Sequence, residues 1–312
     1  MTLLADYALT PHVFDETAYS SEEVCIARLE RVKDVLLNQA IIRDLRNGDW
    51  LSLLSSDQPQ WNKRGRELLK KLKQQNRFHK FASSPRPDPK NEEDWCAEAL
   101  ETDRPEHPLT GIIASGGIAR DFASNPKIAS IDRLGSAAWW AQCNESMRLN
   151  RTLQDYQEAL RLVLLHSNSI MFIDPHLDPD KPGYKDFVTL LSGVGNRKPH
   201  PRIEIHRVCY EGSGRERLIR ENDYFEEKFR REMSPLADRG LPVEIFIWDD
   251  FHDRYVISNL VGISVPYGFD TANGSKNRTT WTRLSRSDHD EVQKEFDPAG
   301  RDHKLHHQFK IG

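Results

Sequence analysis

The chain has 312 residues and carries 44 Lys and Arg against 48 Asp and Glu, a net charge of −4. A chain of this length can bury enough apolar surface for one large domain or two ordinary ones. The nearly balanced charge excludes a protein that holds a polyanion through its global charge, so nucleic acid would need a local basic patch.

The cysteines and the N-terminal segment indicate the cellular setting. Cys25, Cys96, Cys143 and Cys209 are widely spaced and form no Cys-x-x-Cys pair. This spacing disfavours a zinc ribbon and a disulfide scaffold, and it is typical of a reducing cytoplasm. The sequence begins without a basic segment and a long apolar run, and no stretch approaches about 18 apolar residues. We therefore expect a cytoplasmic protein with no membrane segment.

The first part of the chain gives a weak α/β pattern. Residues 7–10, a helix over 20–38 and residues 41–45 can form a shortened β-α-β unit. A second amphipathic helix is predicted over about 60–75, and its outer face is rich in Lys and Arg. We interpret that face as solvated, with a nucleic-acid groove as the alternative. Residues 1–130 are therefore predicted to form a mainly helical or diverged α/β lobe.

A regular alternation of strands and helices follows in the predicted second domain, residues 131–312. Strands over 169–174, 202–208 and 242–248 alternate with helices over 184–193 and 221–233. This alternation predicts a parallel sheet with right-handed crossovers, and the short runs after residue 254 predict a hairpin. The fold class is α/β, with a mixed, mostly parallel sheet flanked by helices in the C-terminal lobe.

Polar side chains collect where the predicted strands of this domain end. Asp174 and His176 follow the first strand, Asp250 follows the third, and His252 and Arg254 open the fourth. Ligands of open α/β sheets bind at the carboxyl ends of the strands, so we expect these side chains at one site. Alternate residues of a strand share a face, which would let the last two contact one anionic group. Phosphate is the expected group, because Arg offers paired N–H donors to its oxygens.

Other candidates near this site have two interpretations. Two prolines frame His176, which is either a structural turn residue or a second catalytic histidine. Trp248 precedes the acidic pair and is expected to line the pocket. The histidines near the C-terminus are interpreted as solvated rather than as metal ligands, so no metal is expected: His303, His306 and His307.

The segment His252-Asp253-Arg254-Tyr255, with the strand before it, resembles a lobe of the phospholipase D-like superfamily. The signature of that superfamily is His-x-Lys, then an Asp four residues later, then Gly-Ser-x-Asn. On this resemblance His252 takes the position of the nucleophile, Arg254 that of the phosphate-holding Lys, and Asn259 that of the Asp. Gly262-Ile263-Ser264 corresponds loosely to the Gly-Ser segment. The resemblance covers about residues 150 to 285.

The resemblance implies phosphodiester hydrolysis through a phosphohistidine, with no metal and no cofactor. One His attacks phosphorus and a second His protonates the leaving oxygen. The superfamily builds its site from two such motifs and this chain has one, which implies a homodimer in which two copies of His252 face each other. The remaining substrate-binding positions are then Asp174, Asp250, Ser264 and Trp248.

A closer likeness to uncharacterised prokaryotic domains of the His-Asp-Arg-Tyr type implies a setting in defence or mobile-element biology. The expected activity is that of a nuclease on DNA or RNA, with a possible protein partner from a defence system. The alternative is a catalytically inactive phospholipase D-like platform that binds a protein or a nucleic acid, because Asn259 and the altered Gly-Ser segment depart from the signature.

Overall fold

The computed structural model describes residues 3–56, 60–140, 145–212, 214–271 and 277–312. The chain divides into two compact units, Met1–Asn144 and Glu145–Gly312. The division therefore falls after residue 144 rather than after residue 130. The strand Ile128–Ser130 pairs with Gly111–Ala114, and this pairing holds the chain beyond residue 130 in the first unit.

The first unit is an α/β structure. Its helices and strands, in chain order, are β1 (Ala5–Leu9), α1 (Glu22–Gln39), β2 (Ala40–Asp44), α2 (Asp49–Ser52), α3 (Lys63–Gln74), β3 (Phe78–Lys80), α4 (Glu92–Glu101), β4 (Gly111–Ala114), α5 (Ile118–Asp121) and β5 (Ile128–Ser130).

The five strands of the first unit form one parallel sheet in the order β3-β2-β1-β4-β5. Every residue of β1, β2 and β4 is buried, as expected for a parallel sheet covered on both faces. The predicted β-α-β unit is confirmed as β1, α1 and β2. The first unit is thus organised around a sheet. The prediction of a mainly helical lobe was incomplete, because β3 and β5 are too short to show the periodicity of a strand in the sequence.

The helix α1 shows how local sequence sets one of these elements. Ser21 caps the helix and accepts a hydrogen bond from the backbone N–H of Val24. Four apolar residues then recur on one face and are buried against the sheet: Cys25, Leu29, Val32 and Leu36.

The second unit is also an α/β structure. Its helices and strands are β6 (Ser146–Asn150), α6 (Leu153–His166), β7 (Ser169–Ile173), α7 (Asp186–Leu191), β8 (Arg202–Val208), β9 (Tyr210–Glu211), β10 (Leu218–Ile219), α8 (Asn222–Glu232), α9 (Ser234–Asp238), β11 (Val243–Trp248), β12 (Tyr255–Ser258), β13 (Gly262–Ser264), β14 (Arg278–Arg283), α10 (Arg286–Glu295) and β15 (Leu305–Ile311).

Eight strands of this unit form one mixed sheet in the order β15-β11-β8-β7-β12-β13-β14-β6. The predicted parallel series is confirmed, because β8 pairs in parallel with both β7 and β11. The hairpin of β12 and β13 is confirmed as well. The sheet as a whole is mostly antiparallel, contrary to the prediction, because β15, β12, β13, β14 and β6 all join through antiparallel pairings.

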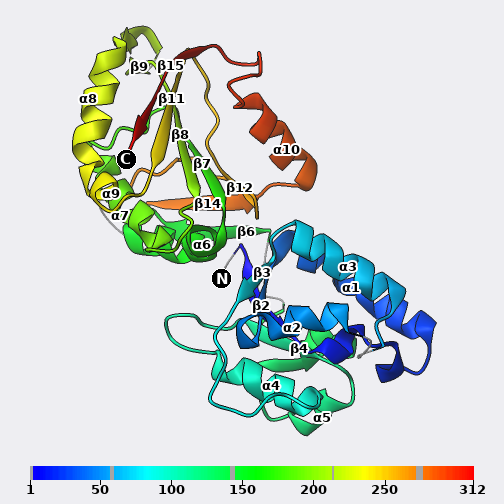
Figure 1. The fold of residues 1–312 in the computed structure, drawn as a ribbon. Coiled ribbons are helices and arrows are strands. Elements are labelled where there is room, and N and C mark those ends of the chain that lie inside the picture. The colour runs from blue at the N-terminus through cyan, green and yellow to red at the C-terminus, as the bar shows by residue number, and fades with distance from the viewer. Residues whose placement is uncertain (1–2, 57–59, 141–144, 213, 272–276) are drawn as a thin grey trace. The chain divides into compact units, whose positions relative to one another are not determined.

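Helices cover both faces of this sheet, and α8 and α10 lie on opposite sides of it (Figure 1). Neighbouring residues of β8 point to these two sides. Arg207 lies under the ring of Phe225 in α8, whereas His206 packs against Phe296 at the end of α10. In the described part of the chain, no helix is long and apolar enough to cross a membrane.

Candidate functional site

The loop that follows β7 meets the loop that connects β11 to β12 at one edge of the eight-stranded sheet. His252 and Arg254 lie in that last loop, since β12 begins only at Tyr255. The sequence had predicted that these two side chains share one face of a strand. They do not, because both residues precede the strand. Nη1 of Arg254 donates a hydrogen bond of 3.2 Å to the backbone carbonyl of His252.

Asp174 is buried at this edge of the sheet. Its side chain is fully buried and accepts hydrogen bonds from the backbone N–H groups of His176 (3.0 Å) and Phe269 (3.2 Å). It also accepts one from the hydroxyl of Tyr184 (3.1 Å). Burial raises the pKa of Asp174, while these donors and the nearby guanidinium of Arg254 lower it. A carboxylate this enclosed positions its neighbours and does not contact a substrate, contrary to the sequence prediction.

A glycine allows the chain to close over Asp174. Gly268 has φ +61°, and a Cβ atom at that position would overlap Oδ2 of Asp174. Both observations exclude an ordinary side chain there, because the backbone is left-handed and the space is already occupied. The turn at Gly268 therefore brings the backbone N–H of Phe269 to the buried carboxylate.

Arg254 connects the buried carboxylate with the surface. Its Nε lies 3.5 Å from Oδ1 of Asp174, and 26% of its side chain is exposed. Within the described ranges, Asp174 and the carbonyl of His252 are the polar partners of this guanidinium. An Arg has five N–H donors, so several remain for an oxyanion from outside.

His176 is held neutral at this edge. The side chain is half-buried, and burial lowers its pKa to about 4, with further lowering by the positive charges of Arg254, Arg207, Lys181 and His252. Ile173, three residues before His176, pairs with Tyr255, the residue after Arg254. The structure thus brings the predicted second histidine to the same edge as His252 and Arg254.

Asp250 lies at the exposed side of the site. It accepts a hydrogen bond of 2.5 Å from the hydroxyl of Tyr210 and one of 2.9 Å from Nη1 of Arg217. These bonds, with the charge of His252, lower the pKa of Asp250, although burial opposes them. Asp250 is therefore an ionised carboxylate beside His252. The sequence analysis did not identify Tyr210 or Arg217, which lie in a segment without a regular pattern.

Arg207 is a further residue that the sequence analysis missed. Its guanidinium is fully buried and donates to the backbone carbonyls of Val208 (2.9 Å), Leu177 (2.9 Å) and Tyr210 (3.1 Å). It thereby ties the loop that carries His176 to the loop after β8. The signal was an Arg in a strand that the sequence placed inside a parallel sheet, because a charged side chain is rarely buried there without a specific role.

Two predicted residues do not join the site. Asn259 lies at the far end of β12, where its Oδ1 accepts from the backbone N–H groups of Asn168 (2.7 Å) and Ser169 (3.3 Å). Because β7 and β12 are antiparallel, this places Asn259 at the start of β7 and Arg254 at its end, roughly 15 Å apart along the strand. Trp248 is fully buried, and its indole N–H donates to Nδ1 of His206 (3.0 Å). It contributes to the core and offers no surface to a substrate.

Ser264 lies at the correct end of the sheet. It pairs with Tyr255, the residue that follows Arg254, and it is partly exposed. The backbone N–H of Val265 donates to the carbonyl of Arg254 (2.9 Å), so this hairpin strand fixes the Arg backbone. Ser264 therefore lies beside the site, because its partner in the neighbouring strand, Tyr255, directly follows Arg254.

The C-terminal histidines belong to structure rather than to a solvated tail. His306 and His307 lie in β15, which pairs with β11. His307 contacts Glu226 (3.1 Å), and His303 contacts Glu295 (2.7 Å). The sequence interpretation was wrong here because β15 alternates polar and apolar residues only weakly.

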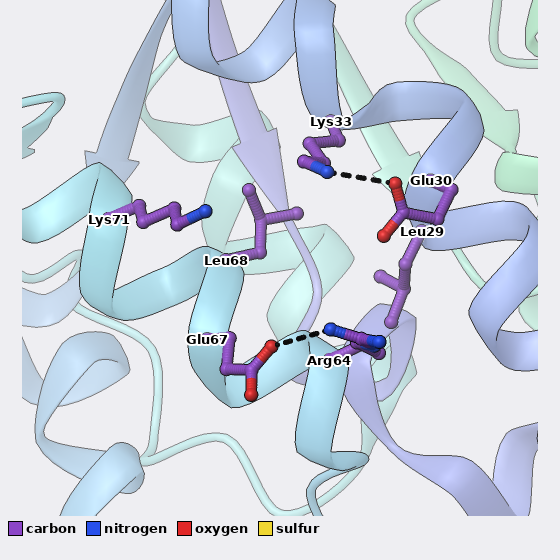
Figure 2. A pocket seen from close by; sticks show the side chains of 7 residues that line it. All are labelled: Leu29, Glu30, Lys33, Arg64, Glu67, Leu68 and Lys71. Atoms are coloured by element: carbon purple, nitrogen blue, oxygen red, sulfur yellow. Dashed lines mark hydrogen bonds and ion pairs between the residues drawn. The ribbon is translucent and has the colours of Figure 1, made fainter.

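A separate groove of about 50 Å³ lies in the first unit between α1 and α3 (Figure 2). Two ion pairs neutralise most of its charge, Lys33 with Glu30 (2.9 Å) and Arg64 with Glu67 (3.1 Å). Internal pairing of this kind on exposed helix faces favours the solvated interpretation of the basic helix over a nucleic-acid groove.

Comparisons with known proteins identify no family. No family model matches the chain, and no curated protein matches it. Among solved structures, polyphosphate kinase from Porphyromonas gingivalis aligns with a TM-score of 0.31 at 9% identity, over 47% of this chain and 25% of the kinase. The archaeal chromatin protein TrmBL2, whose structure shows a novel mode of DNA binding, aligns with the same TM-score at 12% identity, over 78% of this chain and 82% of TrmBL2. Neither similarity is strong enough to assign a function.

Proposed function

We propose that this chain is a phospholipase D-like phosphodiesterase, and specifically a nuclease that acts through a phosphohistidine. The observation that carries the proposal is the presence of His176, His252 and Arg254 at one edge of the sheet, where Ile173 before His176 pairs with Tyr255 after Arg254. His176 supplies the second imidazole that the single motif lacks. The chemistry therefore does not depend on the homodimer expected from the sequence, which stays a separate proposal.

The charge states favour a division of labour between the two imidazoles. The free N–H groups of Arg254 bind the non-bridging phosphate oxygens. A nucleophile must be unprotonated, and His176 meets this condition throughout the neutral range because its pKa is lowered to about 4. We therefore assign the attack on phosphorus to His176, although the resemblance placed the nucleophile at His252.

The reaction then has two balanced steps. Nitrogen of His176 bonds to phosphorus, the ester P–O bond breaks, and His252 as imidazolium donates its proton to the leaving oxygen. Water next attacks the phosphohistidine, and neutral His252 accepts one water proton. The P–N bond breaks, which releases the phosphate monoester and regenerates both histidines.

A nuclease assay in the presence of a chelator tests this proposal. We expect cleavage of single- or double-stranded DNA or RNA, reduced by about 10²–10⁴-fold in His252→Ala and in His176→Asn. His107→Ala is the matched control, because that histidine belongs to the first unit, where its ring packs against Phe81. Acid quenching with phosphorus-labelled substrate should leave label on the peptide that contains residue 176. Full activity in both site variants, or no cleavage by the folded wild type, contradicts the proposal.

One observation favours a second candidate, a site that binds a phosphorylated partner or nucleic acid without turnover. Asn259 caps the start of β7, at the opposite end of β12, so the acidic position of the superfamily signature contributes nothing to the site. In this case Arg254→Ala abolishes binding of a short oligonucleotide that wild type holds intact. The setting in prokaryotic defence, and any protein partner there, rest on the sequence resemblance.

A further inference from the structure

Three potential metal ligands converge beside the proposed site. Cys209 follows β8, Asp249 follows β11, and His306 lies in β15, which are neighbouring strands in the sheet. The thiol sulfur, one carboxylate oxygen and one imidazole nitrogen all lie within 4.8 Å of one another. The imidazole Nε2 of His306 is in direct contact with Oδ1 of Asp249.

An irregularity in the sheet directs His306 to this cluster. In the pairing of β15 with β11, Ile247 is opposite His307, but the next residue, Trp248, is opposite Leu305. His306 is therefore the extra residue of a β-bulge. Bulges redirect a side chain at the cost of regular pairing, and they are common beside functional sites. Regular pairing would have opposed His306 to Trp248 instead.

The backbone around the cluster is fixed on every side. The N–H of Cys209 donates to the carbonyl of Trp248 (2.8 Å), and its own carbonyl accepts from Arg220 (2.9 Å). The N–H of Asp249 donates to the carbonyl of Lys304 (3.0 Å). The ligand atoms are thus held by the sheet and do not depend on a flexible loop, which lowers the entropic cost of binding a cation.

We propose that Cys209, Asp249 and His306 bind a divalent transition metal ion of the zinc class, with a fourth position open to water. Sulfur, nitrogen and oxygen donors together suit zinc, and three protein ligands with an open position are common in its sites. Binding forms the metal–sulfur bond and releases the thiol proton to solvent. The thiol is nearly buried, but the side chains of Asp249 and His306 are 39% and 33% exposed, which gives the ion a path of entry.

The bound ion would connect the ends of β8 and β11, next to Tyr210 and Asp250 of the site, with the start of β15. Cys209 and Asp249 directly precede Tyr210 and Asp250, which are joined by a hydrogen bond. Lys304 lies 3.8 Å from the carboxylate of Asp249 and must move away when the cation binds. The ion takes no part in the phosphoryl transfer proposed above, so the two proposals can fail independently.

Titration of the full chain with Co²⁺ tests the site, because cobalt bound to a thiolate has a charge-transfer absorption that free Co²⁺ lacks. We expect one equivalent to bind wild type with this band, and Zn²⁺ to displace it. Cys209→Ser should abolish the band, and His306→Ala should weaken binding by at least about tenfold. Cys96→Ser and His107→Ala are the matched controls, since both residues belong to the first unit and neither is in the cluster, and both should bind as wild type.

Circular dichroism of each variant separates loss of the ligand from loss of the fold. Asp249→Asn provides a third test that keeps the side-chain volume. The proposal is overturned if folded wild type binds no stoichiometric Co²⁺ or Zn²⁺, or if Cys209→Ser keeps the charge-transfer band. Because the readout is optical, the result is independent of whether the chain cleaves nucleic acid.

Discussion

Each unit contains an Arg beside a buried Asp, and the two pairs differ in how completely they are enclosed. In the first unit, Arg43 is 0% exposed and makes two hydrogen bonds to Asp6 (3.0 and 2.7 Å). Its remaining N–H groups donate to Thr102 and to the carbonyl of His107. In the second unit, Arg254 is 26% exposed and lies 3.5 Å from Asp174.

The difference separates a structural ion pair from a candidate ligand site. Five hydrogen bonds use the donors of Arg43, so this residue stabilises the fold and has nothing left for a ligand. Arg254 is held in place by Asp174 but keeps free donors. Asp174 receives hydrogen bonds from other donors, so it can orient Arg254 toward solvent while several N–H groups of the guanidinium remain free for a ligand.

The largest effect is expected from a substitution that breaks the enclosed ion pair of Arg43 and Asp6. Arg43→Ala should lower the free energy of unfolding by about 3–5 kcal/mol, because it removes the cation that pairs with the buried carboxylate of Asp6. Arg254→Ala should cost clearly less stability, since the other donors to Asp174 remain, yet it should abolish phosphate binding. Urea denaturation followed by circular dichroism measures the first effect, and calorimetry with inorganic phosphate measures the second. Equal stability losses in the two variants would remove the distinction.

A smaller effect is expected where the chain closes over Asp174. Gly268→Ala should lose about 1–2 kcal/mol from its left-handed backbone and more from the clash with Oδ2 of Asp174. Gly240→Ala is the matched control, because Gly240 has φ +69° but a Cβ added there would meet no atom within 4 Å, so only the backbone cost applies. Thermal unfolding compares the two variants. If Gly268→Ala is no worse than the control, the turn does not hold Asp174.

The smallest effect concerns proton binding. The pKa of His176 is lowered to about 4 in the folded chain against 6.5 for an ordinary His. The unfolded state therefore binds this proton first, so folding stability falls as the pH drops from about 6.5 toward 4. Arg254→Ala should raise the pKa of His176, because it removes a positive charge, and Arg286→Ala should leave it unchanged. Chemical shifts of the imidazole measure both values; a wild-type pKa near 6.5 would contradict the assignment of His176 as the neutral histidine.

The sequence predicted the strands best where apolar residues run together. β7, β8 and β11 are almost wholly buried, and their parallel series followed from the pattern alone. β15 and β6 were missed because their exposed positions are filled by polar residues, which obscures a short strand. Together with β12, β13 and β14 they make the sheet mostly antiparallel. Strand pairing between distant segments depends on contacts that periodicity does not encode.

The sequence by itself determined which residue types surround the site. It places a His and an Arg two residues apart before β12, an Asp and a His after β7, and an Asp after β11. Only the tertiary structure decided their roles. It buried Asp174, brought His176 to Arg254, and moved Asn259 to the far end of β12. It also joined Cys209, Asp249 and His306, which are far apart in the sequence. The physical reason is that pKa, charge range and ligand distance depend on burial and on neighbours from other strands, which are fixed only when the sheet assembles.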